Sequence, residues 1–212
     1  MFPLFAGLFA GALHVISGPD HLAAIAPLSA ERGPGSARLG FRWGLGHSGG
    51  VVLVGLLALL LRESFDITAF AADGEWLVGI TLIGIGLWGL RRAYAGKIRD
   101  TEHDHGPVQH AHIHLADGGN SHRHNHTAFA IGTLHGMAGS SHVLGIVPAL
   151  ALPTVTEAAL FLGAYTIGTI LTMTLFAAGL GAIASRCEQF IKPLFATCSA
   201  AAFAIGCAWL FL

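Results

Sequence analysis

The sequence predicts an all-α membrane protein in which six transmembrane helices form two inverted three-helix repeats with broken first helices. Three observations support this fold class. The composition is strongly apolar, the apolar residues are grouped into long runs, and one histidine-containing stretch occurs twice. The 212 residues are 53% hydrophobic and 11% charged, whereas a soluble domain has about 25% charged residues. Too few charges remain to cover a soluble surface, which argues against a soluble helical protein with a large core.

Six apolar runs account for most of the chain, at residues 4–28, 41–61, 76–90, 128–152, 158–184 and 190–212. About 20 apolar residues are needed to cross the hydrocarbon core of a bilayer, and these runs reach or approach that length. We expect helices, because open strands in lipid would leave backbone groups unpaired and the alternation that a barrel needs is absent. Many of the 29 glycines lie within the runs, where small residues let membrane helices pack closely.

The basic residues predict the orientation of the chain. Of the eleven Lys and Arg residues, all but Arg62 lie in the first, third and fifth connections between runs or at the run ends beside them. The positive-inside rule makes those connections cytoplasmic, so we expect a multi-pass protein of the bacterial plasma membrane with both termini outside. The first basic residue, Arg32, follows the first run, which is not the pattern of a signal peptide. Cys187, Cys198 and Cys207 form no CxxC pair, so they indicate neither a disulfide framework nor a zinc site.

One stretch of the chain is duplicated. Residues 11–28 align without gaps on residues 132–149. The matched histidines are His14 with His135 and His21 with His142. Each half then holds three spans, and an odd number of spans means that the second half enters the membrane from the opposite side. Inverted repeats of this kind are common in secondary transporters, whose substrate site lies near the midplane between broken helices.

Gly18 and Pro19 interrupt the first run between its two histidines. In a continuous helix, His14 and His21 would lie about 10 Å apart along the axis. That is too far for both to bind one ion through bonds of about 2 Å. Proline removes a backbone donor and kinks a helix, so we predict a break that brings these histidines and Asp20 together.

The sequence predicts a metal site inside the membrane, because ionisable residues at that depth are costly and usually functional. Imidazoles with one carboxylate suit nickel, cobalt or zinc and suit magnesium or calcium poorly. The predicted metal ligands are His14, Asp20, His21, His47, His135 and His142, with Ser48, Ser140, Ser141 and Thr166 as supporting polar groups and Gly139 as the helix break of the second copy. For a single histidine, a hydrogen bond between helices would be an adequate explanation. The duplication and the aspartate favour a metal site, anchored on the first half because Ser141 replaces Asp20 in the second.

A histidine-rich tract separates the two halves. Its histidines are His103, His105, His110, His112, His114, His122, His124 and His126. This composition is typical of a metal-binding tract and is too polar to form a core, so we expect it to lack regular structure. We therefore divide the chain into a first three-helix repeat (1–96), a His-rich cytoplasmic loop (97–126) and a second three-helix repeat (127–212). The loop is interpreted as a metal buffer, donor or sensor, with a plain solvated linker as the alternative.

Two short motifs suggest a family. The pattern His14…Asp20-His21, followed by Leu45-Gly46-His47-Ser48, resembles the nickel/cobalt transporter family, and within it the shorter six-span permeases associated with urease and hydrogenase. That family has His, four residues and Asp-His on one span, and Leu-Gly-His-Ser on the next; here five residues separate the first pair. The resemblance implies secondary uptake of nickel or cobalt. It also implies that the histidines of both motifs and Asp20 recognise the ion.

The sequence therefore favours a permease that moves divalent transition-metal ions, nickel before cobalt, into the cytoplasm, and not an enzyme. We expect no resident cofactor. The expected partners are the lipid bilayer, the transported Ni2+ or Co2+ and a cytoplasmic metallochaperone, with no nucleic acid. Because neutral imidazole is the ligand, binding should weaken below about pH 6.

Two other hypotheses stay open. One is a nickel/cobalt exporter for metal resistance, in which the histidine-rich tract collects ions for expulsion. The other is a membrane haem or redox protein, because histidines on different helices can ligate haem. No HExxH motif indicates a metallohydrolase.

Overall fold

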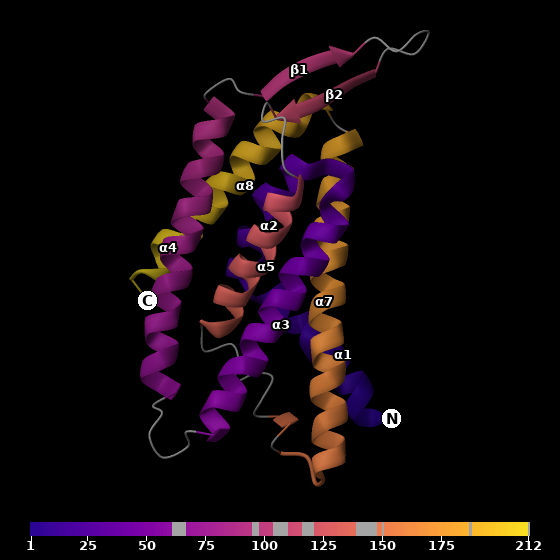
Figure 1. Ribbon diagram of the computed structural model, residues 1–212, viewed down its shortest axis with the longest axis vertical. Coiled ribbons are helices and arrows are strands. Elements are labelled where there is room, and N and C mark those ends of the chain that lie inside the picture. The colour runs from indigo at the N-terminus through magenta and orange to yellow at the C-terminus, as the bar shows by residue number, and fades with distance from the viewer. Residues whose placement is uncertain are drawn as a thin grey trace.

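The described part of the chain forms a helical bundle with a two-stranded hairpin at one end (Figure 1). The structure is a computed structural model, and the residues that it describes are 1–60, 67–94, 98–103, 110–115, 121–138, 148–149, 151–186 and 188–211. The elements are α1 (Phe2–Ser17), α2 (Pro19–Arg32), η1 (Gly33–Gly35), α3 (Ser36–Leu60), α4 (Ile67–Tyr94), β1 (Ile98–His103), β2 (His110–Leu115), α5 (Ser121–Met137), α7 (Val155–Arg186) and α8 (Glu188–Trp209).

The first apolar run is broken at Gly18, as the sequence predicted. Helix α1 ends at Ser17 and α2 begins at Pro19, and the chain bends by 74° between Phe2–Ser17 and the segment Pro19–Val54. The Gly18 N–H donates to the carbonyl of His14 at 3.1 Å and closes α1. Pro19 occupies the first position of α2, where its missing donor has no cost and its fixed φ suits the helix.

The chain is an integral membrane protein with several spans. Among the described residues, the segments long and apolar enough to cross a membrane are Glu75–Tyr94, Val155–Arg186 and Ile191–Trp209, with the bent pair Phe2–Ser17 and Pro19–Val54 as a fourth. The prediction of six spans is therefore confirmed only in part by the described residues. Helix α5 falls short because it has 17 residues and begins in polar, histidine-rich sequence. Large apolar side chains such as Phe5, Phe9 and Ile16 are exposed on α1, where lipid would contact them.

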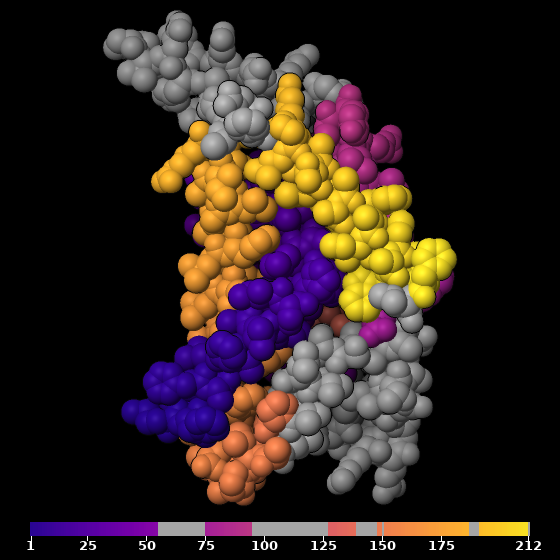
Figure 2. Space-filling view, turned by 180° about the vertical axis from the view of Figure 1, so that it is seen from behind, coloured from indigo at the N-terminus to yellow at the C-terminus, as the bar shows by residue number. Residues whose placement is uncertain are grey.

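The helices pack in pairs around a central region. Helix α1 packs against α7, α5 against α3, and α4 against α8, while α2 packs against both α7 and α8. Figure 1 shows α5 in the middle of the bundle, between α4 and α8 on one side and α3 and α7 on the other. From behind, α1 runs obliquely across the face between α7 and α8 (Figure 2). The buried core includes Val15, Ile25, Trp43, Leu82 and Met173.

Glycines bring two of these pairs into backbone contact. A β-carbon at Gly11 would overlap the carbonyl oxygen of Tyr165 on α7, and one at Gly132 would overlap the carbonyl oxygen of Trp43 on α3. Gly132 is also the residue that aligns with Gly11 in the duplicated stretch. Close approach through small residues is a common way to pack membrane helices, and here it is used at equivalent positions of the two copies.

The histidine-rich tract corrects one prediction, because it contains regular secondary structure. Strands β1 and β2 pair antiparallel, with His103 opposite His110. The second strand reads HAHIHL, which alternates with the period of two that a strand requires; amino-acid composition alone does not reveal this pattern. Helix α5 begins at Ser121, so it takes in His122, His124 and His126. His105 lies outside the described residues.

Candidate metal centre

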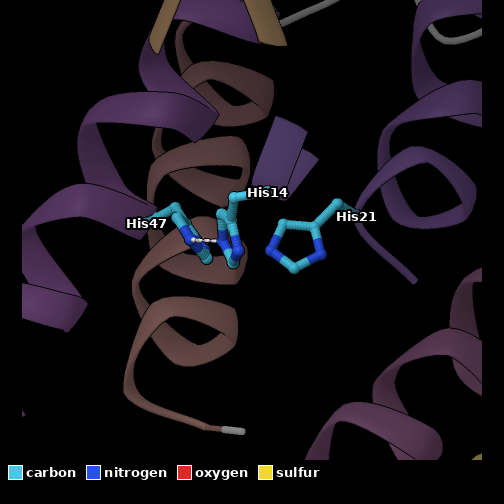
Figure 3. A group of neighbouring side chains, drawn as sticks. All are labelled: His14, His21 and His47. Carbon is cyan, nitrogen blue, oxygen red and sulfur yellow. Dashed lines mark hydrogen bonds between the residues drawn. The ribbon is translucent and has the colours of Figure 1, made fainter. Parts of the chain in front are cut away.

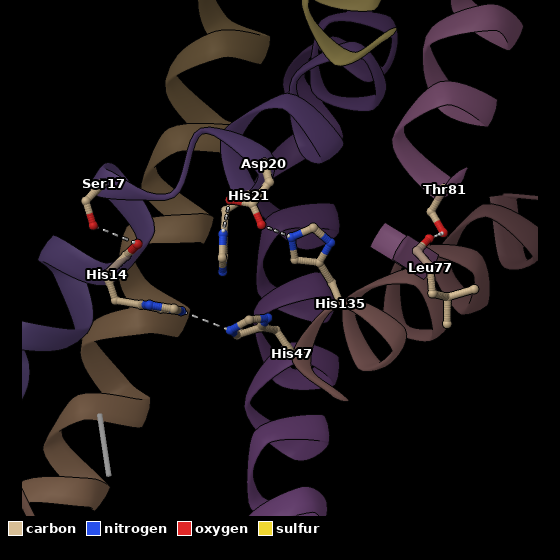
Figure 4. A network of polar contacts seen from close by, with 8 residues as sticks. All are labelled: His14, Ser17, Asp20, His21, His47, Leu77, Thr81 and His135. Carbon is tan, nitrogen blue, oxygen red and sulfur yellow. Dashed lines mark hydrogen bonds and ion pairs between the residues drawn. The ribbon is translucent and has the colours of Figure 1, made fainter. Parts of the chain in front are cut away.

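A cluster of buried ionisable side chains lies beside the helix break. Its members are His14 of α1, Asp20 and His21 of α2, His47 of α3 and His135 of α5. Each is at most 8% exposed. Figure 4 shows these side chains pointing toward one another from four helices. The break at Gly18 makes this possible, because the rings of His14 and His21 have centroids only 4.6 Å apart.

Three of the imidazoles form a group that one ion could bind. His14 Nε2 and His47 Nε2 are 3.3 Å apart. The His21 ring lies 4.6 Å from that of His14 and 4.8 Å from that of His47, measured between centroids. The nitrogens of a tetrahedral site with bonds of about 2.0–2.1 Å lie about 3.3 Å apart. The spacing of His14 and His47 therefore fits a metal ion bound between them.

Asp20 fixes how the rings of His21 and His135 present their nitrogens. Its Oδ1 accepts a hydrogen bond from His21 Nδ1 at 3.0 Å, and its Oδ2 accepts one from His135 Nε2 at 2.9 Å. Because Nδ1 of His21 carries the proton, Nε2 carries the lone pair. Metal-binding histidines usually donate their second nitrogen to a carboxylate in this way.

The Nε2 atom of His21 is a buried nitrogen without a hydrogen-bond partner among the described residues. The edge of the ring that carries it faces His14 and His47 (Figure 3). A buried polar atom without a partner is costly, and an ion bound to all three imidazoles would satisfy it. This atom is the most direct structural sign that the cluster binds a ligand.

Two aromatic side chains line the cluster and were not predicted from the sequence. Trp43 stacks on His47, with ring centroids 5.5 Å apart and planes within 5° of parallel. Tyr165 lies 5.6 Å from His14 between ring centroids. The sequence could have indicated the contact between Trp43 and His47, because residues four positions apart share a helix face. The sequence could not indicate the contact between Tyr165 and His14, since it depends on how α7 packs against α1.

The remaining predicted site residues have other surroundings. Ser48 is buried on α3, and its hydroxyl has no hydrogen-bond partner in the part of the chain that the structure describes. Thr166 is half-buried on α7, but it is Thr169 whose hydroxyl donates to the Tyr165 carbonyl at 3.0 Å and lies 3.5 Å from that of Gly11. The predicted residues that lie outside the described ranges are Gly139, Ser140, Ser141 and His142.

The histidine cluster does not fit a haem. Two imidazoles on opposite sides of a haem iron need about 4 Å between their nitrogens, because each iron–nitrogen bond is about 2 Å long and the macrocycle lies between them. His14 Nε2 and His47 Nε2 are only 3.3 Å apart, and the His21 ring stands beside both. The nitrogens of His14, His21 and His47 therefore suit a metal ion without a macrocycle and leave no room for a porphyrin between them.

Comparison with known proteins identifies the family to which this chain belongs. Residues 4–208 match the family described as Cytochrome C biogenesis protein transmembrane region. The sequence is 35% identical over 193 residues to Chloroplast protein FOR GROWTH AND FERTILITY 2 of Arabidopsis thaliana, and 33% identical over 198 residues to Chloroplast protein FOR GROWTH AND FERTILITY 1 of the same plant. Each alignment covers 88% of this chain but only 48% and 50% of the relatives, so the chain spans about half their length. No solved structure matches.

These matches contradict the resemblance to nickel/cobalt transporters, and with it the predicted nickel or cobalt permease. The resemblance depended on two short motifs, whereas the family match extends over residues 4–208. A histidine–aspartate motif at a helix break is selected by the geometry of ion binding, so it can occur in families that share no ancestry or cargo. Of the hypotheses drawn from the sequence, the membrane redox protein agrees best with the match.

Proposed function

Since the chain belongs to the cytochrome c biogenesis transmembrane-region family, we propose that it is a membrane redox protein that binds a redox-active transition-metal ion through His14, His21 and His47. The observation that carries this proposal is the convergence of three buried imidazoles. His14 Nε2 lies 3.3 Å from His47 Nε2. The Nε2 of His21, which has no hydrogen-bond partner among the described residues, faces both.

The donor set narrows the choice of ion. Imidazole binds zinc, copper, iron and nickel well, and affinity along the divalent series peaks at copper. Zinc has no redox chemistry, so the redox function requires copper or iron, with copper as the tighter binder. When bound, the ion supplies a one-electron couple in a water-poor environment, and burial of that kind tunes the potential of a metal site.

The protein residues have distinct tasks in this proposal. The imidazoles of the three histidines hold the ion, and each comes from a different helix, α1, α2 or α3. Asp20 keeps a proton on His21 Nδ1, which leaves Nε2 as the donor to the ion. Trp43 lies parallel to the His47 ring and restricts its rotation. The burial of all these side chains keeps water away from the ion.

The described cysteines do not offer an alternative route for electrons. Cys198 and Cys207 lie on α8, where a separation of nine positions places them about 13 Å apart along the helix axis. A disulfide requires Cα atoms within about 7 Å of each other, so this pair cannot cycle between dithiol and disulfide within one chain. The third cysteine, Cys187, lies outside the described residues.

We also infer that the two halves are inverted repeats that cross the membrane six times, with the metal site between them. Equivalent glycines, Gly11 and Gly132, each meet a backbone carbonyl of the other half, which is the pattern that an inverted duplication would give. The hydrogen bond between Asp20 and His135 also joins the two halves at the site.

The proposed function is tested by copper binding and redox titration of the purified protein in lipid nanodiscs. Wild-type protein should bind copper with a reversible one-electron couple, followed by the EPR signal of Cu(II). His47→Gln should lose the copper ion that His14, His21 and His47 hold. Thr81→Val is a suitable control, because the Thr81 hydroxyl lies outside the cluster and donates within α4 to the Leu77 carbonyl at 2.8 Å. Wild-type protein that binds only zinc, or no metal ion, would refute the proposal.

A further inference from the structure

We infer that the cluster holds a second metal ion, bound by Asp20 and His135, and that the imidazole of His21 bridges the two ions. This inference rests on the proposed metal site formed by His14, His21 and His47. It assigns Asp20 and His135 as ligands in their own right, in addition to their role in orienting His21 when the second ion is absent.

The cluster divides into two donor sets that share one residue. His14, His21 and His47 make the first set, and Asp20, His21 and His135 make the second; within each set, one ligand atom from each residue lies within 4.8 Å of the others. Figure 4 shows the His21 ring standing between the pair His14–His47 and the pair Asp20–His135.

The two nitrogens of His21 face different sets. Its Nδ1 lies 3.0 Å from Asp20 Oδ1, whereas the edge that carries Nε2 faces His14 and His47. The lone pairs of the two ring nitrogens diverge, so one ion cannot bond to both of them. An imidazole placed between two donor sets in this way can bond to one ion through each nitrogen.

The distances in the second set suit an ion. Asp20 Oδ1 and His21 Nδ1 are 3.0 Å apart, and Asp20 Oδ2 and His135 Nε2 are 2.9 Å apart. Ligand atoms that share an ion with bonds of about 2.0–2.2 Å lie about 3 to 3.5 Å apart. An ion can therefore take the place of the two shared protons.

The proton balance of the second ion is simple, and no electrons move when it binds. His21 releases its Nδ1 proton to solvent and becomes an imidazolate, while His135 transfers its proton from Nε2 to Nδ1 and stays neutral. The Asp20 carboxylate and the imidazolate then supply two negative charges. These offset the positive charge of the ions in a low-dielectric interior, where an unbalanced charge is expensive.

The test counts copper ions per chain. Wild-type protein, His135→Gln and His14→Gln are stripped with a chelator, loaded with Cu(II) in lipid nanodiscs, and analysed by elemental analysis and low-temperature EPR. We expect two copper ions per wild-type chain, with an EPR intensity well below the copper content because the imidazolate couples the two spins. Each variant should bind one copper ion with full EPR intensity.

Other outcomes separate this inference from the proposed function. One copper ion per wild-type chain, with full EPR intensity and unchanged in His135→Gln, would overturn the second ion while leaving the first site intact. No bound copper in wild-type protein would overturn both. Thermal unfolding of each variant shows whether it has folded, and Thr81→Val, which lies outside the cluster, should keep both ions.

Discussion

The contact between Gly136 and His47 allows a quantitative test of how precisely the helices hold the site. A β-carbon at Gly136 would overlap the carbonyl oxygen of His47 and would lie 2.7 Å from its carbonyl carbon and 2.8 Å from its Cα. Ordinary contacts begin at 3.4 Å, so in Gly136→Ala the close-packed backbones of α5 and α3 must separate by about 0.7 Å or more. Metal and catalytic sites must be held to within about 0.5 Å. The separation would move both His47 and the neighbouring His135.

We therefore expect Gly136→Ala to lower copper affinity at least tenfold and to lower the free energy of unfolding by about 1–3 kcal/mol, the usual cost of overpacking. Gly49→Ala is the matched control, because Gly49 follows His47 on α3 and a β-carbon there would have nothing within 4 Å. Affinity is measured by competition with a chelator in lipid nanodiscs, and stability by thermal unfolding. Wild-type behaviour of Gly136→Ala, or an equal loss in Gly49→Ala, would refute this reasoning.

Three further predictions concern the ligands and their surroundings. Trp43→Ala should shift the reduction potential of the bound copper and weaken its binding about tenfold, whereas Trp43→Phe should retain most of the stacking on His47; a redox titration of both variants checks this, and identical potentials would contradict it. Copper affinity should fall as the pH drops below about 6, because protonated imidazole cannot bind the ion; an affinity constant between pH 5 and 8 would argue against imidazole ligands. The double variant Cys198→Ser and Cys207→Ser should keep the wild-type couple, and its loss would show that thiols carry the electrons.

Much of the candidate site could be predicted because its determinants are local in the sequence. Gly18 and Pro19 predict the break, and the break brings His14 close to His21. The duplication added His135, which lies beside Asp20 as a hydrogen-bond donor. What the sequence could not indicate was this pairing itself, since it depends on how α5 packs against its neighbours. Glycines in the sequence indicate that helices pack closely, but they do not indicate which helix lies against each glycine.

The family assignment failed for a related reason. A motif of a few residues around His14 and His47 specifies an ion-binding geometry. Common descent is detected over most of the chain, which lies outside these motifs. The prediction that the histidine-rich tract lacks regular structure was wrong, because it followed from the polar composition of the tract and not from the spacing of its apolar residues. The alternation in His110–Leu115 matches a strand, and the structure places β2 there.

Gly18 shows that the helix break and the donor chemistry are a single feature. Its N–H ends α1 on the His14 carbonyl, and its own carbonyl accepts the first hydrogen bond of α2, from His21 N–H, each at 3.1 Å. Its backbone, at φ −90° and ψ 94°, is open to any residue, so the break alone does not require glycine. The requirement comes from space, because a β-carbon would overlap His21 Nδ1 and lie 3.0 Å from Asp20 Oδ1. Glycine is thus needed at this position for the hydrogen bond that leaves Nε2 of His21 available to an ion.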